Sequence, residues 1–385
     1  MNPFEFATAT RVRFGPGTVA RLAEEISDIP GPGFLVTARD PERAESVRRA
    51  LRQAGRTWTE WRNVGEPTVS AVVQGSEQAK ASGSRWVVAC GGGATIDAGK
   101  AIAALATNAG DPFDFLEVVG RGLPLRARPL PFIAIPTTAG TGAEVTRNAV
   151  LGSPEHRVKV SLRSPWMLPA AAIVDPSLSL SLPASVTAST GLDALTQLLE
   201  PFVGIRANPL TDALCRDGLP RITRNLERVF ENPAELEARS EMALASLFSG
   251  MALANSGLGA VHGIAGPLGG MSDIPHGTLC AALLVPVWVA NCAALASERD
   301  PDNRLSRYRE AAQLLTGNPG ADTADGARWL AEMVGRLGIP RLRDLGVTRE
   351  SFGEIVPKAE AASSMKGNPV RLGPQGIREV LDAAW

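Results

Sequence analysis

The chain of 385 residues is longer than one ordinary domain, and its length predicts two. Hydrophobic residues make up 44% of it and charged residues 21%, a composition that is typical of a folded globular protein and excludes a largely disordered one. The 39 basic and 40 acidic residues almost cancel, so there is no cationic excess with which to bind nucleic acid or an anionic membrane.

Cysteine usage and the N-terminus indicate the compartment. The chain has four cysteines: Cys90, Cys215, Cys280 and Cys292. They lie in apolar stretches without CxxC spacing, which predicts free thiols in a reducing environment. Residues 1–6 show no basic or apolar segment of a signal peptide, and the most apolar run, 281–294, is too short to span a bilayer. We therefore expect a cytoplasmic protein with a buried helix over that run.

The first half of the chain alternates short apolar runs with helical patterns. Four runs are predicted as buried strands: 33–37, 86–90, 132–136 and 171–175. A helical pattern covers 43–54. Unbroken apolar strands separated by helices predict a parallel sheet that is covered on both faces.

After Pro183 long amphipathic segments replace the strands. The predicted helices cover 184–203, 212–230, 234–254, 278–296, 303–315 and 322–337. Prolines are expected to punctuate them: Pro201, Pro220, Pro233, Pro267, Pro275 and Pro340. This pattern predicts a helical bundle, with an α/β domain over 1–180 and an all-α domain over 181–385.

A glycine-rich segment, Gly91-Gly92-Gly93-Ala94-Thr95-Ile96-Asp97, follows the second predicted strand directly and opens a helix. Glycines let a backbone approach a pyrophosphate, and the helix start offers free N–H donors. The alternative is a tight strand-to-helix turn without a ligand. The spacing fits neither GxGxxG nor a Walker A loop.

A threonine-rich loop, Thr137-Thr138-Ala139-Gly140-Thr141-Gly142-Ala143-Glu144, follows the third predicted strand. Hydroxyls at the carboxyl end of a parallel strand suit contacts with phosphate, ribose or amide groups. Thr138 or Thr141 could instead simply cap a helix. The nearby glycine loop favours the ligand interpretation.

Four polar residues of the helical half form a candidate metal site. Asp193 and Gln197 are four residues apart and share a helix face, while His262 and His276 both precede a glycine. Two imidazoles, a carboxylate and an amide oxygen could hold a divalent transition metal. Each residue also has an ordinary structural alternative, such as helix-dipole pairing for Asp193.

Together these motifs resemble the iron-containing (group III) alcohol dehydrogenase family. The likeness runs from Phe14-Gly15-Pro16-Gly17 through the glycine and threonine loops, Asp175-Pro176 and Gly191-Leu192-Asp193-Ala194 to the stretch 262–277. The resemblance implies a dehydroquinate synthase-like architecture, with an α/β dinucleotide-binding domain, an all-α metal domain and an active site in the cleft between them. It also implies the interconversion of an alcohol and a carbonyl compound with NAD or NADP.

The family pattern implies roles for particular residues. Gly92, Gly93, Ala94 and Asp97 would line the cofactor pyrophosphate; Thr137, Thr138, Thr141 and Lys159 would contact the rest of the cofactor. Asp193, Gln197, His262 and His276 would occupy the four positions that ligate Fe or Zn, with Asp193 and the two histidines as catalytic residues.

The chain departs from the family pattern at three positions. Gln197 stands where the family usually has a ligating histidine, and Gly266 where it often has a histidine that relays a proton. After the first dinucleotide strand, Ala38 stands where NAD-preferring members often have aspartate, and Arg39 follows it. The loss of that carboxylate and an adjacent guanidinium predict that NADPH is accepted, unless Arg39 points to solvent and Asp40 merely caps the next helix.

The expected activity is metal-assisted hydride transfer between the cofactor and a small alcohol or carbonyl substrate. Three alternatives remain at this point: a maleylacetate reductase-like enzyme, a dehydroquinate synthase-like lyase and a non-catalytic dinucleotide-binding homologue. Apolar faces in the helical half predict a homodimer.

Overall fold

The structure is a computed structural model that describes residues 3–297 and 303–385. The chain divides into two compact units. Ala7–Ser181 form one, and Leu182–Trp385 form the other together with the N-terminal residues up to Phe6. The division after Ser181 lies one residue from the predicted boundary, whereas residues 3–6 group with the helical unit rather than with the α/β unit.

The α/β unit contains a six-stranded parallel sheet. Its strands are β1 (Val12–Phe14), β2 (Gly33–Thr37), β3 (Trp58–Arg62), β4 (Trp86–Gly91), β5 (Phe132–Pro136) and β8 (Ala171–Val174). Their spatial order is β1-β8-β5-β4-β2-β3. The four apolar runs predicted as strands are β2, β4, β5 and β8. The two edge strands, β1 and β3, were not predicted because each is only partly buried and therefore polar.

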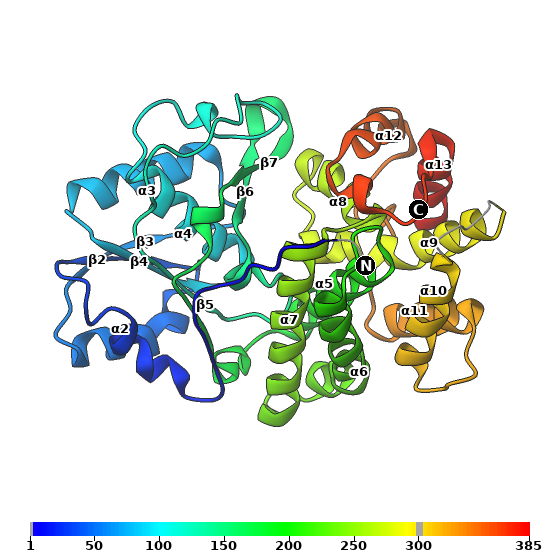
Figure 1. Ribbon diagram of the computed structural model, residues 1–385, viewed down its shortest axis with the longest axis horizontal. Helices are drawn as coiled ribbons and strands as arrows, with labels where there is room; N and C mark the ends of the chain where they lie inside the picture. The colour runs from blue at the N-terminus through cyan, green and yellow to red at the C-terminus, as the bar shows by residue number, and fades with distance from the viewer. Residues whose placement is uncertain (1–2, 298–302) are drawn as a thin grey trace. The chain divides into compact units, whose positions relative to one another are not determined.

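Helices cover both faces of this sheet (Figure 1). One face packs on α1 (Leu22–Glu25) and α2 (Glu45–Gln53), and the other on α3 (Val69–Ala81) and α4 (Gly93–Leu105). Neighbouring residues of a strand point to opposite faces. Leu35 accordingly lies in the α2 cluster and Phe34 in the α3–α4 cluster, so each central strand must be apolar throughout. A short 3₁₀ turn precedes α2, which starts two residues later than predicted.

A two-stranded antiparallel hairpin, not predicted from the sequence, follows the sheet's third central strand. It consists of β6 (Asn148–Ser153) and β7 (Val158–Arg163). The carboxylate of Asp97 on α4 accepts a hydrogen bond from the Val150 amide at 3.0 Å, which ties the hairpin to the glycine-loop helix.

The second unit is helical. Its longer helices are α5 (Ala184–Val203), α6 (Pro209–Glu231), α7 (Leu236–Ser256), α8 (Ala260–Met271), α9 (His276–Ser297), α10 (Arg304–Thr316), α11 (Thr323–Arg336), α12 (Phe352–Ala361) and α13 (Gly373–Ala384). The bounds of α5 are those predicted. Pro201, Pro220 and Pro267 lie inside α5, α6 and α8, so they do not separate helices as expected.

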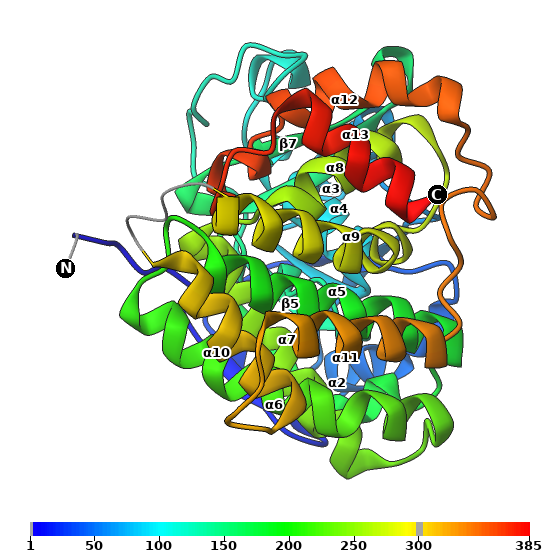
Figure 2. The ribbon, with the colours of Figure 1, turned by 90° about the vertical axis from the view of Figure 1, so that its right-hand side faces the viewer.

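The centre of this unit is α5, which packs on α6, α7 and α9 (Figure 2). Every residue from Gly191 to Val203 is buried, as expected of a helix surrounded by others. The apolar helix α9 is long enough to cross a membrane by length and composition alone, yet half of its most apolar window is buried against other helices. Its packing on α5, α8, α11 and α13 is that of a core helix.

Candidate active site

The buried helix α5 carries Asp193 and Gln197 one turn apart. Asp193 is 1% exposed and Gln197 3%. The Gln197 amide donates to Asp193 Oδ2 at 2.9 Å, and its oxygen accepts from Ser249 of α7 at 3.0 Å. Both groups of the carboxamide are thus engaged, and Gln197 holds the Asp193 carboxylate in a fixed orientation.

His262 lies in the first turn of α8. Side chains from other elements cap the start of this helix. The amide of Val261 donates to Glu200 at 2.6 Å, and that of Ala260 donates to the Asn368 side chain at 3.0 Å. The other oxygen of Glu200 lies 2.7 Å from Nδ1 of His262. Because a carboxylate accepts, Nδ1 carries the proton and Nε2 presents its lone pair.

Helix α9 begins with His276 and approaches α5 very closely. A Cβ at Gly277 would lie 2.5 Å from the Ser189 carbonyl oxygen, so only glycine permits this approach. Cys280 follows His276 by one helical turn and is fully buried, with its sulfur 3.5 Å from Nε2 of His276.

Four side chains converge at one point within the helical unit: Asp193, His262, His276 and Cys280. One ligand atom from each lies within 4.8 Å of all the others. Asp193 Oδ1 and His262 Nε2 are 3.4 Å apart, and both are buried without a hydrogen-bond partner. Because buried polar atoms are normally paired, two unpaired ones that face each other fit a cation between them.

The imidazoles of this cluster favour the ionised forms of Asp193 and Cys280. Burial opposes ionisation of Asp193, but the neighbouring imidazoles of His262 and His276 lower its pKa. Burial likewise opposes ionisation of Cys280, yet the same two imidazoles lower the pKa of its thiol. A carboxylate and a thiolate beside two imidazoles are the donor types that bind divalent transition metals.

Gly266 lies one turn after His262 on α8 and contributes nothing to this cluster. A Cβ built there would meet no atom within 4 Å. The position therefore has room for a side chain. Because glycine has none, Gly266 cannot relay a proton as the family's histidine is thought to do.

In the α/β unit, the sheet register brings the predicted cofactor loops to one edge. Thr37 is level with Cys90, and Gly91 is level with Pro136. The chain leaves β2 toward β3 and leaves β4 toward β5, in opposite directions, so the topological switch point lies between β2 and β4. Ligands of open parallel sheets bind at the carboxyl ends of the strands at such a point.

The glycine and threonine loops are in direct contact. A Cβ on Gly92 would lie 3.4 Å from the Thr138 methyl, and one on Gly93 would lie 2.6 Å from Thr141. Thr137 donates its amide to the Gly91 carbonyl at 2.9 Å. Within the described chain no side chain caps α4, which begins at Gly93-Ala94. Its first N–H groups are therefore available to a phosphate.

The remaining predicted cofactor residues differ in their contacts and exposure. Asp97 is held between the Val150 amide and Lys100, so its carboxylate anchors β6. Lys159 lies on β7 and pairs with Glu66 at 3.0 Å. Ala38 is half-buried and Arg39 exposed. Asp40 caps the 3₁₀ turn before α2 through the Glu42 amide, as the alternative interpretation anticipated.

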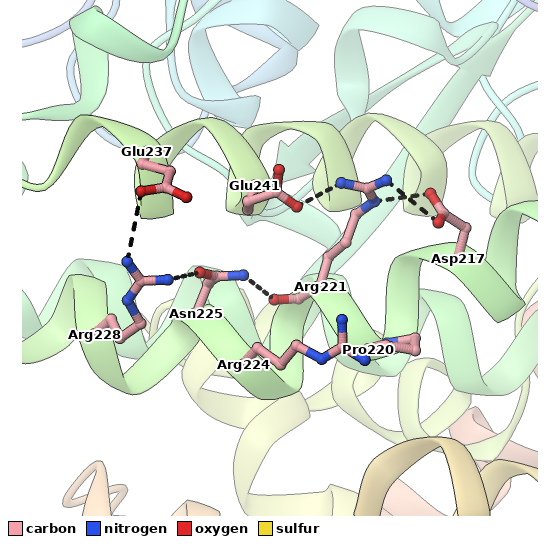
Figure 3. A pocket seen from close by; sticks show the side chains of 8 residues that line it. All are labelled: Asp217, Pro220, Arg221, Arg224, Asn225, Arg228, Glu237 and Glu241. Atoms are coloured by element: carbon pink, nitrogen blue, oxygen red, sulfur yellow. Dashed lines mark hydrogen bonds and ion pairs between the residues drawn. The ribbon is translucent and has the colours of Figure 1, made fainter. Parts of the chain in front are cut away.

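A surface pocket of about 410 Å³ between α6 and α7 offers a different site, but its charges neutralise one another (Figure 3). Arg221 pairs with both Asp217 and Glu241, and Arg228 with Glu235 and Glu237. We therefore place the functional site at the buried cluster and the sheet edge.

A parallel α/β unit with glycine- and threonine-rich loops at the carboxyl edge of its sheet, together with a helical unit that holds a buried carboxylate–imidazole cluster, is typical of a nicotinamide-linked, metal-dependent dehydrogenase. The chain belongs to the iron-containing alcohol dehydrogenase family. Residues 9–176 match the family profile described as iron-containing alcohol dehydrogenase, and residues 187–385 match the profile of the family's C-terminal part.

Individual relatives agree with this assignment. The 1,3-propanediol dehydrogenase of Citrobacter freundii is 34% identical over 386 residues, covering 97% of this chain and 96% of the relative. The 4-hydroxybutyrate dehydrogenase of Cupriavidus necator is 36% identical over 322 residues, covering 82% of each chain. A crystal structure of a 1,3-propanediol oxidoreductase superposes with a TM-score of 0.90 at 32% identity and full coverage of both chains.

The chain is therefore an NAD(P)-dependent oxidoreductase that interconverts alcohols with aldehydes or ketones and uses a metal. These relatives are dehydrogenases and give no support to the lyase or the non-catalytic alternative.

Sequence reasoning missed Cys280 of the cluster and Glu200, which hydrogen-bonds to His262. Cys280 follows His276 by four residues, and Glu200 follows Asp193 by seven, so both spacings place the pairs on one helix face. The spacing alone carried the signal, but Cys280 lies in an apolar run that is also typical of a core cysteine, and a lone glutamate in an amphipathic helix is also typical of its solvent-facing side.

Proposed function

We propose that this enzyme interconverts a small primary alcohol and its aldehyde at the cluster of Asp193, His262 and His276. The observation that carries the proposal is the facing pair of unpartnered buried atoms, Asp193 Oδ1 and His262 Nε2, 3.4 Å apart. The relatives named for 1,3-propanediol and 4-hydroxybutyrate support a small hydroxylated substrate.

The residues present fit a divalent metal, which when bound would polarise the substrate oxygen for hydride transfer. Asp193, His262 and His276 would hold it. Glu200 keeps the proton of His262 on Nδ1 and so leaves Nε2 free for the site. Gln197 fixes the Asp193 carboxylate, and the surrounding helices exclude bulk water, which strengthens each electrostatic contact.

The nicotinamide cofactor supplies or accepts the hydride, and residues at the edge of the sheet would bind it. The α4 start at Gly92, Gly93 and Ala94 would receive the pyrophosphate, and Thr137, Thr138 and Thr141 in the adjoining loop would contact the rest of the cofactor. Asp97 would act indirectly, by anchoring the hairpin that carries Lys159.

We further propose that NADPH is accepted. The support is Ala38, which places no carboxylate beside the ribose. Arg39 is exposed and Asp40 caps the following turn, so Arg39 would have to turn toward a 2′-phosphate at the carboxyl end of β2 when the cofactor binds. Turnover with NADH and NADPH should be compared in the parent and in Arg39→Ala. We expect the variant to lose NADPH turnover selectively; a strong NADH preference of the parent would contradict the proposal.

The test of the metal role separates chemistry from cofactor binding. Asp193→Ala and the double variant His262→Ala/His276→Ala should lose turnover on an aldehyde panel yet bind NADPH as the parent does. Asp217→Ala, in the surface pocket between α6 and α7, is the matched control and should keep full activity. Full activity in the cluster variants would refute the metal role.

The cytoplasmic location and the homodimer remain part of the proposal. The four free cysteines support a reducing compartment. Fractionation of the source cells and the mass of the purified chain in solution, measured by light scattering, test the two points.

A further inference from the structure

We infer that Cys280 is a protein ligand of this metal centre, in the place that the sequence pattern gave to Gln197, and that its thiolate makes the site select Zn²⁺ over Fe²⁺. The inference rests on the proposed metal-assisted function, because it names the fourth donor of the same site.

The interatomic distances fit a tetrahedral donor set. With Zn–N and Zn–O bonds of about 2.0–2.1 Å and Zn–S of about 2.3 Å, neighbouring donors of a tetrahedron lie roughly 3.3–3.8 Å apart. Asp193 Oδ1 and His262 Nε2 are 3.4 Å apart, and His276 Nε2 and the Cys280 sulfur 3.5 Å. These two pairs share no atom, so they would be opposite edges of a tetrahedron, and none of the other four distances exceeds 4.8 Å.

Cys280 is placed for this role by its helix. It lies one turn after His276 on α9, so both side chains project from the same face toward α5. The close contact that Gly277 permits brings that face against Asp193, whose Cβ lies 3.4 Å from a Cβ built on Gly277. The other three cysteines, all within the described residues, are outside the cluster.

Gln197, in contrast, is already committed. Its amide nitrogen orients Asp193 and its oxygen accepts from Ser249. A rotation of the oxygen toward a metal would break both hydrogen bonds in a fully buried region, where lost partners are not replaced by water. A neutral amide oxygen is also a weaker donor for a borderline metal than a thiolate.

The thiolate increases a preference for Zn²⁺ over Fe²⁺ that nitrogen and oxygen donors already have. Soft thiolate ligands favour Zn²⁺, whereas Fe²⁺ is better served by imidazole and carboxylate. The replacement of an imidazole donor by sulfur therefore shifts the site of this chain toward zinc.

The experiment uses Co²⁺ as a spectroscopic substitute for zinc. The full chain is produced in medium with Co²⁺ and its absorption recorded, because only a Co²⁺–thiolate bond gives an intense sulfur-to-metal charge-transfer band in the near ultraviolet. We expect the band in the parent and its loss in Cys280→Ser. Cys292→Ser, on the same helix but outside the cluster, should keep it.

Metal affinity gives the second readout. Competition with a chromophoric chelator should show that Cys280→Ser binds Zn²⁺ at least tenfold more weakly than the parent, while its Fe²⁺ affinity changes less. Growth of the parent with equal Zn²⁺ and Fe²⁺ should give mainly zinc by elemental analysis. Absence of the band from the parent, its persistence in Cys280→Ser, or preferential retention of iron would overturn the inference.

Failure of this inference is distinguishable from failure of the proposed function. If metal content and turnover depend on Asp193, His262 and His276 but not on Cys280, the function holds and the inference is wrong. If the parent binds no metal and Asp193→Ala keeps its turnover, the metal role fails as a whole, and with it the inference.

Discussion

Glu200 links α5 to α8 through two hydrogen bonds, one to the Val261 amide and one to the His262 ring. Glu200→Gln keeps the size of the side chain and an oxygen for Val261, but removes the charge that sets the tautomer of His262. We expect metal affinity to fall roughly 10- to 100-fold, the usual effect of losing such an outer partner. Chelator competition measures it.

The control for this variant is Glu332→Gln on the exposed face of α11, which should leave metal affinity unchanged. Metal affinity that stays at the parent level in Glu200→Gln would show that Glu200 merely caps α8.

Glu144, at the end of the threonine loop, predicts a pH dependence of stability. Burial raises its pKa from the ordinary 4.5 to about 7, although the Lys100 ammonium opposes the shift. The protonated form is thus favoured in the folded state. Its stabilising effect is complete below pH 4.5 and is lost as the pH rises toward 7, by on the order of 3 kcal/mol.

Glu144→Gln should remove this loss. Denaturant unfolding of parent and variant between pH 4.5 and 8 tests it, and the difference between them isolates Glu144 from Asp97, whose pKa burial also raises. A parent that gains stability relative to the variant as the pH rises would contradict the expectation.

At the scale of elements, the sequence predicted those strands and helices whose apolar pattern is unambiguous. The buried strands β2 and β5 and the central helix α5 were placed with their observed bounds, because unbroken apolar runs admit few alternatives. Helix α8 was not predicted, since its glycines and Pro267 disfavour a helix. It is held instead by Glu200 and Asn368, which are distant in sequence.

The candidate site was likewise predicted only in part from the sequence. Asp193, His262 and His276 were recognisable by their motifs, but the choice between Gln197 and Cys280 depends on which of them faces the histidines. Only the packing of α9 on α5, made possible at Gly277, shows that.

The contact between the glycine and threonine loops is itself testable. Gly93→Ala would place its Cβ 2.6 Å from the Thr141 side chain and force the loops apart. We expect affinity for the cofactor to fall about tenfold or more, roughly 1.4 kcal/mol, with metal content unchanged. Fluorescence titration with NADPH measures the change.

Gly335→Ala on α11 is the matched control, because a Cβ there meets no atom within 4 Å. It should bind cofactor normally and gain roughly 0.4–1 kcal/mol of stability from reduced chain entropy. Equal cofactor affinity in Gly93→Ala and in the parent would show that the loops tolerate separation.

At the scale of the whole molecule, the metal cluster and the cofactor loops belong to two separate compact units. A ligand protects most strongly the segments whose opening would break its own contacts. NADPH should therefore slow amide hydrogen exchange mainly over residues 91–99 and 136–146. Removal of the metal should instead speed exchange at the start of α8 and over the first turns of α9, where His262, His276 and Cys280 would lose their common partner.

Exchange followed by mass spectrometry, with and without NADPH and a chelator, measures both effects on one preparation. The Asp193→Ala protein supplies the control: NADPH should still protect the two loops, whereas the chelator should change nothing further. If NADPH or the chelator changed amide exchange equally in both units, the two units would respond as one body. The assignment of the metal site and the cofactor site to different units would then be wrong.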